Sequence, residues 1–196
     1  MITAGQKTGR FFTGCLLMLL MAVVVLGPMP ARAQAEQARE YQIKAAFIYN
    51  FFKFIDWPET PLSDTPDTIS ICILGKDPFG DIFAPIEGKT VKNKKLAIKR
   101  VSSPGEIGSC QILFVCPSEQ ERLGPILAST CGKSILTVSD IKDFARQGGM
   151  VGFFSAENTV GFAINLKATE RSGLKMSSKL LEMATVIADA PAKDCR

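Results

Sequence analysis

The sequence predicts an α/β fold: a three-layer sandwich with a largely parallel sheet, helices on both faces and an antiparallel hairpin at one edge. Short apolar runs, typical of buried strands, alternate along the chain with segments that carry helix-capping residues. Two further apolar runs, 150–154 and 160–166, flank the short turn Ala156-Glu157-Asn158, as strands of a hairpin do. The segment 38–55 has helical periodicity on two faces.

The first 33 residues have the features of a cleavable signal peptide. Lys7 and Arg10 precede a run of 13 residues, Cys15–Gly27, that is apolar up to its closing glycine. Ala31-Arg32-Ala33 then supplies a cleavage pattern, and the run is shorter than the roughly 20 residues that a membrane anchor needs. We therefore expect export, with cleavage near Ala33, and one mature domain formed by residues 34–196.

The expected helix 38–55 ends at Trp57-Pro58 and is apolar on most of its circumference. One stripe consists of Ile43, Phe47, Phe51 and Phe54, and the other of Ala45, Ile48, Phe52 and Ile55. Lys44 stands alone among apolar neighbours. Such a helix is either buried on several sides or covered by a partner.

The remaining elements follow from apolar runs and capping residues. A Pro- and Asp-rich connection, 59–67, precedes strands expected at 68–74, 96–101, 112–116 and 135–138. Expected helices are 78–86, capped by Asp77 and Pro78; 118–129, with a capping box at Ser118 and Glu121; a short helix from Asp140 to Gly148-Gly149; a turn from Lys167; and 175–188.

Composition excludes several classes of chemistry. The chain has no histidine and no Cys-x-x-Cys, which argues against zinc, redox-motif and histidine-assisted nucleophile sites. The adjacent Ser178 and Lys179 face different directions on a helix, so they do not form a dyad. Loss of the signal lowers the net charge from +4 to +1, which gives no footprint for nucleic acid. We expect no catalytic residue, metal or cofactor.

Five cysteines remain after cleavage, and an exported protein is expected to form disulfides. The number is odd, so at least one thiol is free or pairs between chains. If 111–116 is a strand, Cys110 and Cys116 lie about 20 Å apart and cannot pair. The residues alone leave the other pairings open.

Two places admit either a structural or a binding role. Gly75–Gly80 lies where an expected strand meets an expected helix, at the edge where open α/β sheets bind ligands. The segment is either a simple turn or a ligand contact. Arg171 and Lys175 lie near Ser177 and Ser178 at the start of an expected helix. These four residues form an anion-binding corner, or the serines are ordinary caps and the cations face solvent. Trp57, the single tryptophan, is a core aromatic or lines a pocket or interface.

These residues taken together resemble the YfiR-like periplasmic proteins. The segments that carry the resemblance span almost the whole mature chain: Glu40–Phe51 running into Trp57-Pro58, Ile73–Gly80, Cys110–Phe114, Leu136–Asp140, Gly148–Met150, Phe162–Leu166 and Arg171–Leu174. The resemblance implies a non-enzymatic regulator in the periplasm that represses an inner-membrane diguanylate cyclase by binding its periplasmic sensor part, and so limits cyclic di-GMP and biofilm.

The resemblance also implies that the folded state depends on redox through a disulfide between Cys72 and Cys110. A second cysteine pair, found around the Gly148-Gly149 turn in some relatives, is missing here. Cys116, Cys131 and Cys195 do not replace it by position.

Three function hypotheses follow. The first is a regulatory binding protein whose first helix and 162–175 region contact a partner or a second copy. The second is a sensor or carrier of a small anionic or aromatic ligand at the corner of Trp57 and Lys175. The third, an exported enzyme, has no strong motif. The candidate contact residues are Phe52, Trp57, Phe162, Asn165, Arg171, Leu174, Lys175 and Ser177.

Overall fold

A computed structural model describes residues 31–58, 67–156 and 159–188. The chain divides into two compact units, Met1–Gln37 and Ala38–Arg196, and the α/β architecture belongs to the second. The predicted signal peptide lies outside the described residues except for 31–33, which are helical, and it stays a prediction. Among the described residues, no helix is both long and apolar enough to cross a membrane.

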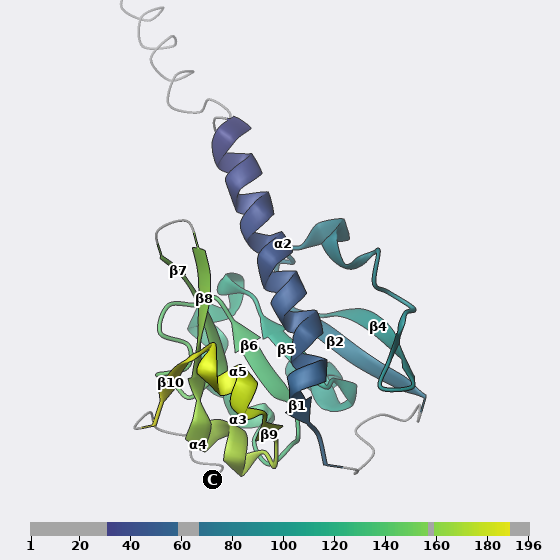
Figure 1. Cartoon of the computed structure of the whole chain (residues 1–196), viewed down its shortest axis with the longest axis vertical. Coiled ribbons are helices and arrows are strands. Elements are labelled where there is room, and N and C mark those ends of the chain that lie inside the picture. Colours follow the sequence, from purple (N-terminus) through teal and green to yellow (C-terminus); the bar gives the residue numbers. More distant parts are fainter. Residues whose placement is uncertain (1–30, 59–66, 157–158, 189–196) are drawn as a thin grey trace, which may run out of the picture. The chain divides into compact units, whose positions relative to one another are not determined.

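The second unit is built on a mixed, mostly parallel sheet of eight strands with few helices (Figure 1). The strand order is β10-β8-β7-β6-β5-β2-β4-β3. Five central strands run parallel: β4 (Lys94–Val101), β2 (Thr68–Leu74), β5 (Ile112–Val115), β6 (Leu136–Ser139) and β7 (Val151–Ala156). The expected strands 68–74, 96–101, 112–116 and 135–138 are therefore confirmed to within a few residues.

The predicted hairpin is also confirmed, because β7 pairs antiparallel with β8 (Thr159–Asn165), with Phe153 opposite Phe162. β10 (Thr185–Ile187) then adds in parallel to β8, and β3 (Thr90–Val91) closes the other end beside β4. The hairpin thus lies inside the sheet, with β10 as the end strand. A separate pair of short strands, β1 (Ile55–Asp56) and β9 (Lys175–Met176), runs antiparallel.

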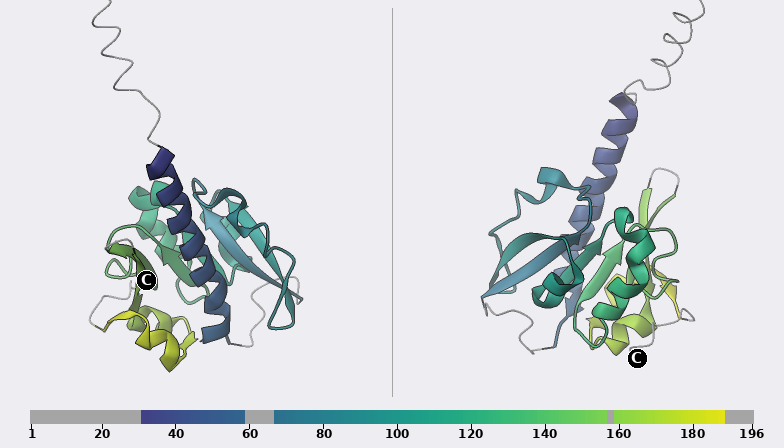
Figure 2. Two further views of the ribbon diagram at one scale, coloured as in Figure 1. Left: turned by 45° about the horizontal axis from the view of Figure 1, so that its top comes forward. Right: turned by 180° about the vertical axis from the view of Figure 1, so that it is seen from behind.

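Two hydrophobic cores use alternate residues of the same strands, as strand geometry requires. Ile71 and Ile73 of β2 belong to the core that holds helix α2 (Ala31–Phe54), while Cys72 and Leu74 belong to the core that holds α3 (Leu123–Ser129). Figures 1 and 2 show α2, from Ala38 on, lying against the sheet. The predicted helix 38–55 is confirmed, and both of its apolar stripes contribute to the core, except for the half-buried Ile43.

Three predicted helices are wrong or shorter than expected. Segment 78–86 contains only the 3-10 helix η1 (Gly80–Phe83), and 118–129 begins as the 3-10 helix η3 (Pro117–Arg122) before α3. Residues 140–148 form turns. In each segment the expected cap residue (Asp77, Ser118 or Asp140) binds a residue distant in the sequence, as described below. The apolar run of each segment is also too short to bury a full helical face.

The predicted helix 175–188 is the largest error. It contains β9, the five-residue helix α5 (Ser178–Glu182) and β10. Thr185, Val186 and Ile187 are β-branched and fit a sheet better than a helix. The turn expected from Lys167 is present as α4 (Leu166–Arg171), and the 3-10 helix η2 (Pro104–Ser109) precedes β5.

Candidate functional site: the carboxyl edge and the Trp57 corner

The chain changes direction across the sheet between β2 and β5. From β2 it passes to β4 on one side, and then returns across β2 to form β5 on the other. In open α/β sheets, ligands bind in the crevice outside the carboxyl ends of strands at such a point. The loops that begin at Gly75 and Cys116 meet there.

This crevice is filled by the chain's own side chains. The backbone N–H of Lys76 donates to Ser118 Oγ at 2.9 Å. A Cβ on Gly75, whose φ is +100°, would lie 2.5 Å from Ser118 Oγ and 2.8 Å from Glu119. Ser118 therefore joins the two loops and does not cap a helix, so the predicted capping box is wrong. Asp77 accepts from Phe79 N at 2.7 Å and from Arg100 Nε at 2.7 Å.

We expect Gly75→Ala to lower the free energy of unfolding by about 2–3 kcal/mol, because it combines a strained φ with a collision across the crevice. Gly88→Ala is the matched control: its φ is +75° but nothing lies within 4 Å of its added Cβ. Urea unfolding of both variants separates strain from crowding. Equal losses for the two would show that the loops do not pack tightly.

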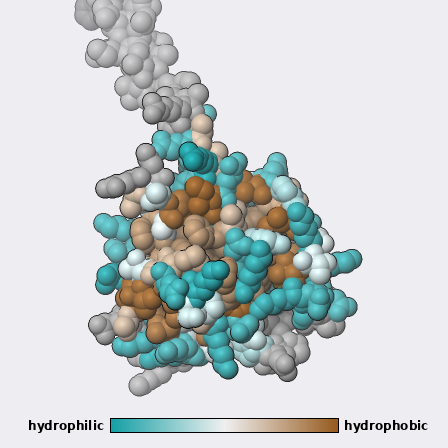
Figure 3. Space-filling view, in the orientation of Figure 1, coloured by the Kyte–Doolittle hydropathy of each residue, from teal (hydrophilic) through white to brown (hydrophobic). Residues whose placement is uncertain are grey.

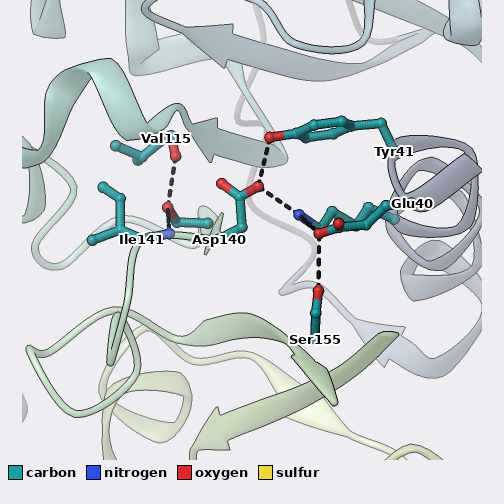
Figure 4. Close-up of polar contacts among 8 residues, drawn as sticks. Glu40, Tyr41, Val115, Asp140, Ile141 and Ser155 are labelled. Carbon is teal, nitrogen blue, oxygen red and sulfur yellow. Dashed lines mark hydrogen bonds and ion pairs between the residues drawn. The ribbon is translucent and has the colours of Figure 1, made fainter. Parts of the chain in front are cut away.

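A buried ion cluster lies beside this edge and ties α2 to the turn after β6 (Figure 4). Lys44 is 3% exposed, and its Nζ lies 2.6 Å from Asp140 Oδ2 and 2.6 Å from Glu40 Oε1. Tyr41 donates its hydroxyl to Asp140 Oδ2 at 2.9 Å, and Ser155 donates to Glu40 at 3.0 Å. The cluster thus joins the helix, the β6 end and the hairpin by charge-assisted hydrogen bonds.

Two members of the cluster, Tyr41 and Glu40, have shifted pKa values. Burial, followed by the charge and the hydrogen bond of Asp140, raises the pKa of the Tyr41 phenol, so it stays a donor. Burial alone would raise the pKa of Glu40, but the hydrogen bond and charge of Lys44 hold it below its ordinary value of 4.5. At neutral pH the Tyr41 hydroxyl therefore stays protonated and Glu40 stays ionised.

Asp140 was expected to cap a helix, and that prediction is wrong. Ser139 takes the capping role, since its Oγ accepts from Ile141 N at 3.0 Å and donates to Val115 O at 2.7 Å (Figure 4). This fixes the turn so that Asp140 faces α2. The isolated lysine among apolar residues was the available signal for a buried ion pair, but nothing local indicates a partner 96 positions away.

Cys116, directly after β5, is a free and buried cysteine, and the expectation that it does not pair with Cys110 is confirmed. Burial and the nearby charges of Asp77, Asp140 and Glu119 raise the pKa of its thiol to about 12. A thiol with so little thiolate at neutral pH is a poor nucleophile. Cys116 is therefore a packing residue.

We expect Cys116 to resist iodoacetamide in the folded protein at pH 8 and to react fully in urea. Mass spectrometry of the labelled chain measures this. Because the folded pKa lies above the unfolded value near 9.0, the thiol also lowers stability as the pH rises from about 9 to 12. Rapid labelling without denaturant would contradict the burial.

Cys72 and Cys110 form the disulfide that the family resemblance implied. Their Cα atoms are 5.8 Å apart, both residues are fully buried in the core beside α3, and the bond closes 38 residues of chain. The closed segment holds β3, β4 and η2. Cys131 is also disulfide-bonded, so this chain has a second disulfide at a position that the sequence did not indicate.

Trp57 and Lys175 lie on neighbouring chain segments, and their expected role as a binding corner stays a prediction. β1 places Asp56 opposite Lys175 of β9, directly before Trp57. The Trp57 ring packs 5.4 Å from Phe52, and Lys92 lies 5.8 Å above it while donating to Ile55 O at 2.8 Å. Trp57 Nε1 is buried without a hydrogen-bond partner. We call Trp57, Lys92 and Lys175 the Trp57 corner.

The other candidate contact residues divide into two groups. Phe52, Phe162 and Leu174 are buried in the core, so we withdraw them from any exposed contact surface. Asn165 is buried as well: it caps α4 by accepting from Ala168 N and donates to Ala145 O. The sequence around these four residues does not distinguish a residue buried in the core from one buried against a partner.

Ser177 lies beside the end of α2, whereas Arg171 lines a separate pocket with Thr130, Cys131 and Ala168. Ser177 caps α5 by accepting from Leu180 N at 3.2 Å, and its own N–H donates to Phe54 O at 2.8 Å. Arg171 and Lys175 are exposed. The ordinary capping role expected of Ser177 is therefore present, and the cations of this region face solvent.

The fold and these sites define a disulfide-bonded α/β domain whose carboxyl edge is closed by its own side chains. The sequence profile of the YfiR/HmsC-like family matches residues 41–185, and the chain belongs to this family. The family consists generally of non-enzymatic regulators.

A search of curated proteins finds no match. Among solved structures, the chain is similar to a conserved domain protein from Vibrio cholerae O1 biovar El Tor, with 8% identity and a TM-score of 0.47. The similarity covers 74% of this chain and 59% of that one.

Proposed function

We propose that this protein is a periplasmic, non-enzymatic repressor of an inner-membrane diguanylate cyclase, which it binds through the cyclase's periplasmic sensor part. Membership of the YfiR/HmsC-like family carries the proposal. The disulfide between Cys72 and Cys110 supports an oxidising compartment. Loss of the cyclase's inhibition would raise cyclic di-GMP and promote biofilm.

Repression depends on redox in this proposal. The disulfide joins β2 to the residues before β5, which are neighbours at the centre of the sheet. Reduction would release the closed segment and loosen the core beside α3. The released segment carries Lys92, so the Trp57 corner would lose the cation that lies over the Trp57 ring. The exposed part of the Trp57 corner is the contact region that we assign to the cyclase.

The test is a pull-down from detergent-solubilised membranes of the host, using the exported protein as bait with and without reductant. We expect to recover a diguanylate cyclase identified by mass spectrometry, and to lose it when Cys72 and Cys110 are replaced by alanine. The substitution Lys175→Glu should weaken recovery, with Lys142→Glu, at another exposed lysine, as the matched control. A folded bait that recovers no cyclase would contradict the proposal.

A second candidate function is sensing of a small anionic or aromatic ligand at the Trp57 corner. The buried Trp57 Nε1 has no acceptor among the described residues, and Lys92 lies over the ring with its Nζ also 3.1 Å from Asp56 Oδ1. A ligand held there would shift the binding of a partner at the same corner according to its differential affinity. Thermal shifts with a panel of anions and aromatic metabolites test this, and a flat panel would count against it.

A further inference from the structure

The second disulfide of this chain has one end in the described residues, at Cys131. Three of the six cysteines are accounted for by the bonded pair and the free thiol described above. Within the chain, Cys131 can therefore be bonded only to Cys15 or to Cys195. Cys15 belongs to the segment that the sequence predicts to be removed on export. The mature protein then offers a single partner, Cys195.

Cys131 lines a small pocket between α3 and α4, two helices that lie close together in the view from behind (Figure 2). The pocket lies where the two hydrophobic cores meet. Leu127, on its α3 side, belongs to one core, whereas Met150 and Ala168 belong to the other. The cation of Arg171, at the end of α4, lines the same pocket. An occupant of this pocket would therefore be small and apolar, with an anionic group beside Arg171.

β10 brings the chain to the start of α4. The strand pairs in parallel with β8 and places Ile187 opposite Asn165, the residue that caps α4. β10 lies at the surface, since Val186 is 43% exposed, and Figure 3 shows hydrophobic surface at the lower left, over the region of β10 and α5. The segment that follows β10 therefore leaves the sheet at the surface, beside the helix that forms one wall of the pocket.

The chain after β10 is long enough to reach Cys131. Residues 188–195 span at most about 28 Å when extended. The six residues of α4 extend over about 9 Å. A chain that runs along α4 can thus cross the pocket and bring Cys195 within the ~7 Å between Cα atoms that a disulfide requires.

The composition of this segment suits the pocket. Pro191 favours an extended chain before it, and its neighbours Ala190 and Ala192 are small and apolar. Asp194 directly precedes Cys195, so a bond to Cys131 would bring a carboxylate to the side of the pocket that holds Arg171. Opposite charges at this position favour the same arrangement as the bond.

We propose that Cys195 is the disulfide partner of Cys131 and that segment 189–196 lies across the pocket between α3 and α4. The bond forms by exchange with the disulfide of a thiol–disulfide oxidase in the oxidising compartment. The two thiols of this chain give up two protons and two electrons, and the oxidase disulfide takes them up and becomes a dithiol. No other reactant is needed.

Each disulfide then encloses one flank of the sheet. The Cys72–Cys110 bond encloses β3 and β4, and a Cys131–Cys195 bond encloses β6, β7, β8 and β10. β5 lies between the two enclosed segments. Because β10 is a three-residue strand next to the end of the chain, where elements fray most easily, the second bond holds the strand that has least support from the sheet.

Peptide mapping of the exported protein, purified without a C-terminal tag, tests the pairing. Free thiols are blocked with iodoacetamide in urea, and the protein is then digested with trypsin without reductant. We expect peptide 123–133, which contains Cys131, to be joined to peptide 194–196, at the sum of their masses less two hydrogens. Reductant should separate the two. An alkylated Cys131, or peptide 123–133 joined to any other peptide, overturns the proposal.

Hydrogen exchange tests the position of the segment. In Cys195→Ser, the amides of α4 and of Gly148–Met150 are expected to exchange about tenfold faster than in the wild type, because the pocket loses its cover. Cys131→Ser should have the same effect, and β2 and β4, on the other flank, should exchange as before. Unchanged exchange around the pocket would place the segment elsewhere. Neither experiment involves the cyclase, so the outcomes do not depend on the proposed function.

Discussion

Replacement of Lys44 by alanine is expected to lower the free energy of unfolding by about 3–5 kcal/mol. The change leaves the 9%-exposed Asp140 carboxylate facing α2 without its cation, and removes the Glu40 contact as well. A buried charge that loses its partner costs far more than an exposed pair that is broken. Urea unfolding followed by circular dichroism measures the loss.

Lys53→Ala is the control, because this lysine is exposed on the same helix and should change the free energy of unfolding by less than about 0.5 kcal/mol. A triple variant, Tyr41→Phe with Lys44→Met and Asp140→Leu, removes the polar groups together and is expected to recover most of the stability. Equal stability of Lys44→Ala and the wild type would show that the pair adds nothing to the docking of α2.

Loss of the disulfide is expected to have an effect of similar size. Replacing both Cys72 and Cys110 by alanine should lower the free energy of unfolding by about 4 kcal/mol, the chain-entropy value for a closed loop of 38 residues. The double variant is preferable to reductant for this measurement, because Cys131 is disulfide-bonded too and would also be reduced. Denaturant unfolding at pH 7 gives the difference.

Cys116→Ala provides the matched control, since it makes the same substitution at a buried cysteine that holds no disulfide. It should cost about 1–2 kcal/mol, from lost packing alone. Because both sulfurs of the Cys72–Cys110 bond lie in a closed core, reduction should also be slow in buffer and fast in urea. A double variant no less stable than Cys116→Ala would contradict a stabilising role for the bond.

The strands were predictable because each is an apolar run bounded by turn residues, as buried parallel strands are. The short helices were not predictable, because a capping residue indicates only a local preference for a helix start. In this structure the side chains of these residues bind residues far away in the sequence. Asp140 binds α2, and Ser118 bonds Lys76 across the carboxyl edge. The β-branched run 185–187 favoured a strand, but the capping signal at Ser177 was extended through it.

The candidate site was predictable only in part. The segments of Trp57 and Lys175 are neighbours, because β1, which ends just before Trp57, pairs with β9, which contains Lys175. Phe52, Phe162 and Leu174 are core residues. The sequence could not show this, because helical or strand periodicity predicts that a side chain is buried without indicating whether the protein's own core or a partner buries it. Lys44 showed its burial by its apolar neighbours, whereas its partner required the tertiary structure.

Repression of a diguanylate cyclase is the central claim, and the rate of cyclic di-GMP formation tests it most directly. Solubilised membranes from a host strain lacking this protein would be supplied with GTP, with and without the purified protein. We expect the wild type to lower the rate in a saturable way and the Cys72→Ala, Cys110→Ala variant to do so weakly or not at all. An unchanged rate at saturating folded protein would show that the protein is not a repressor of a cyclase in these membranes.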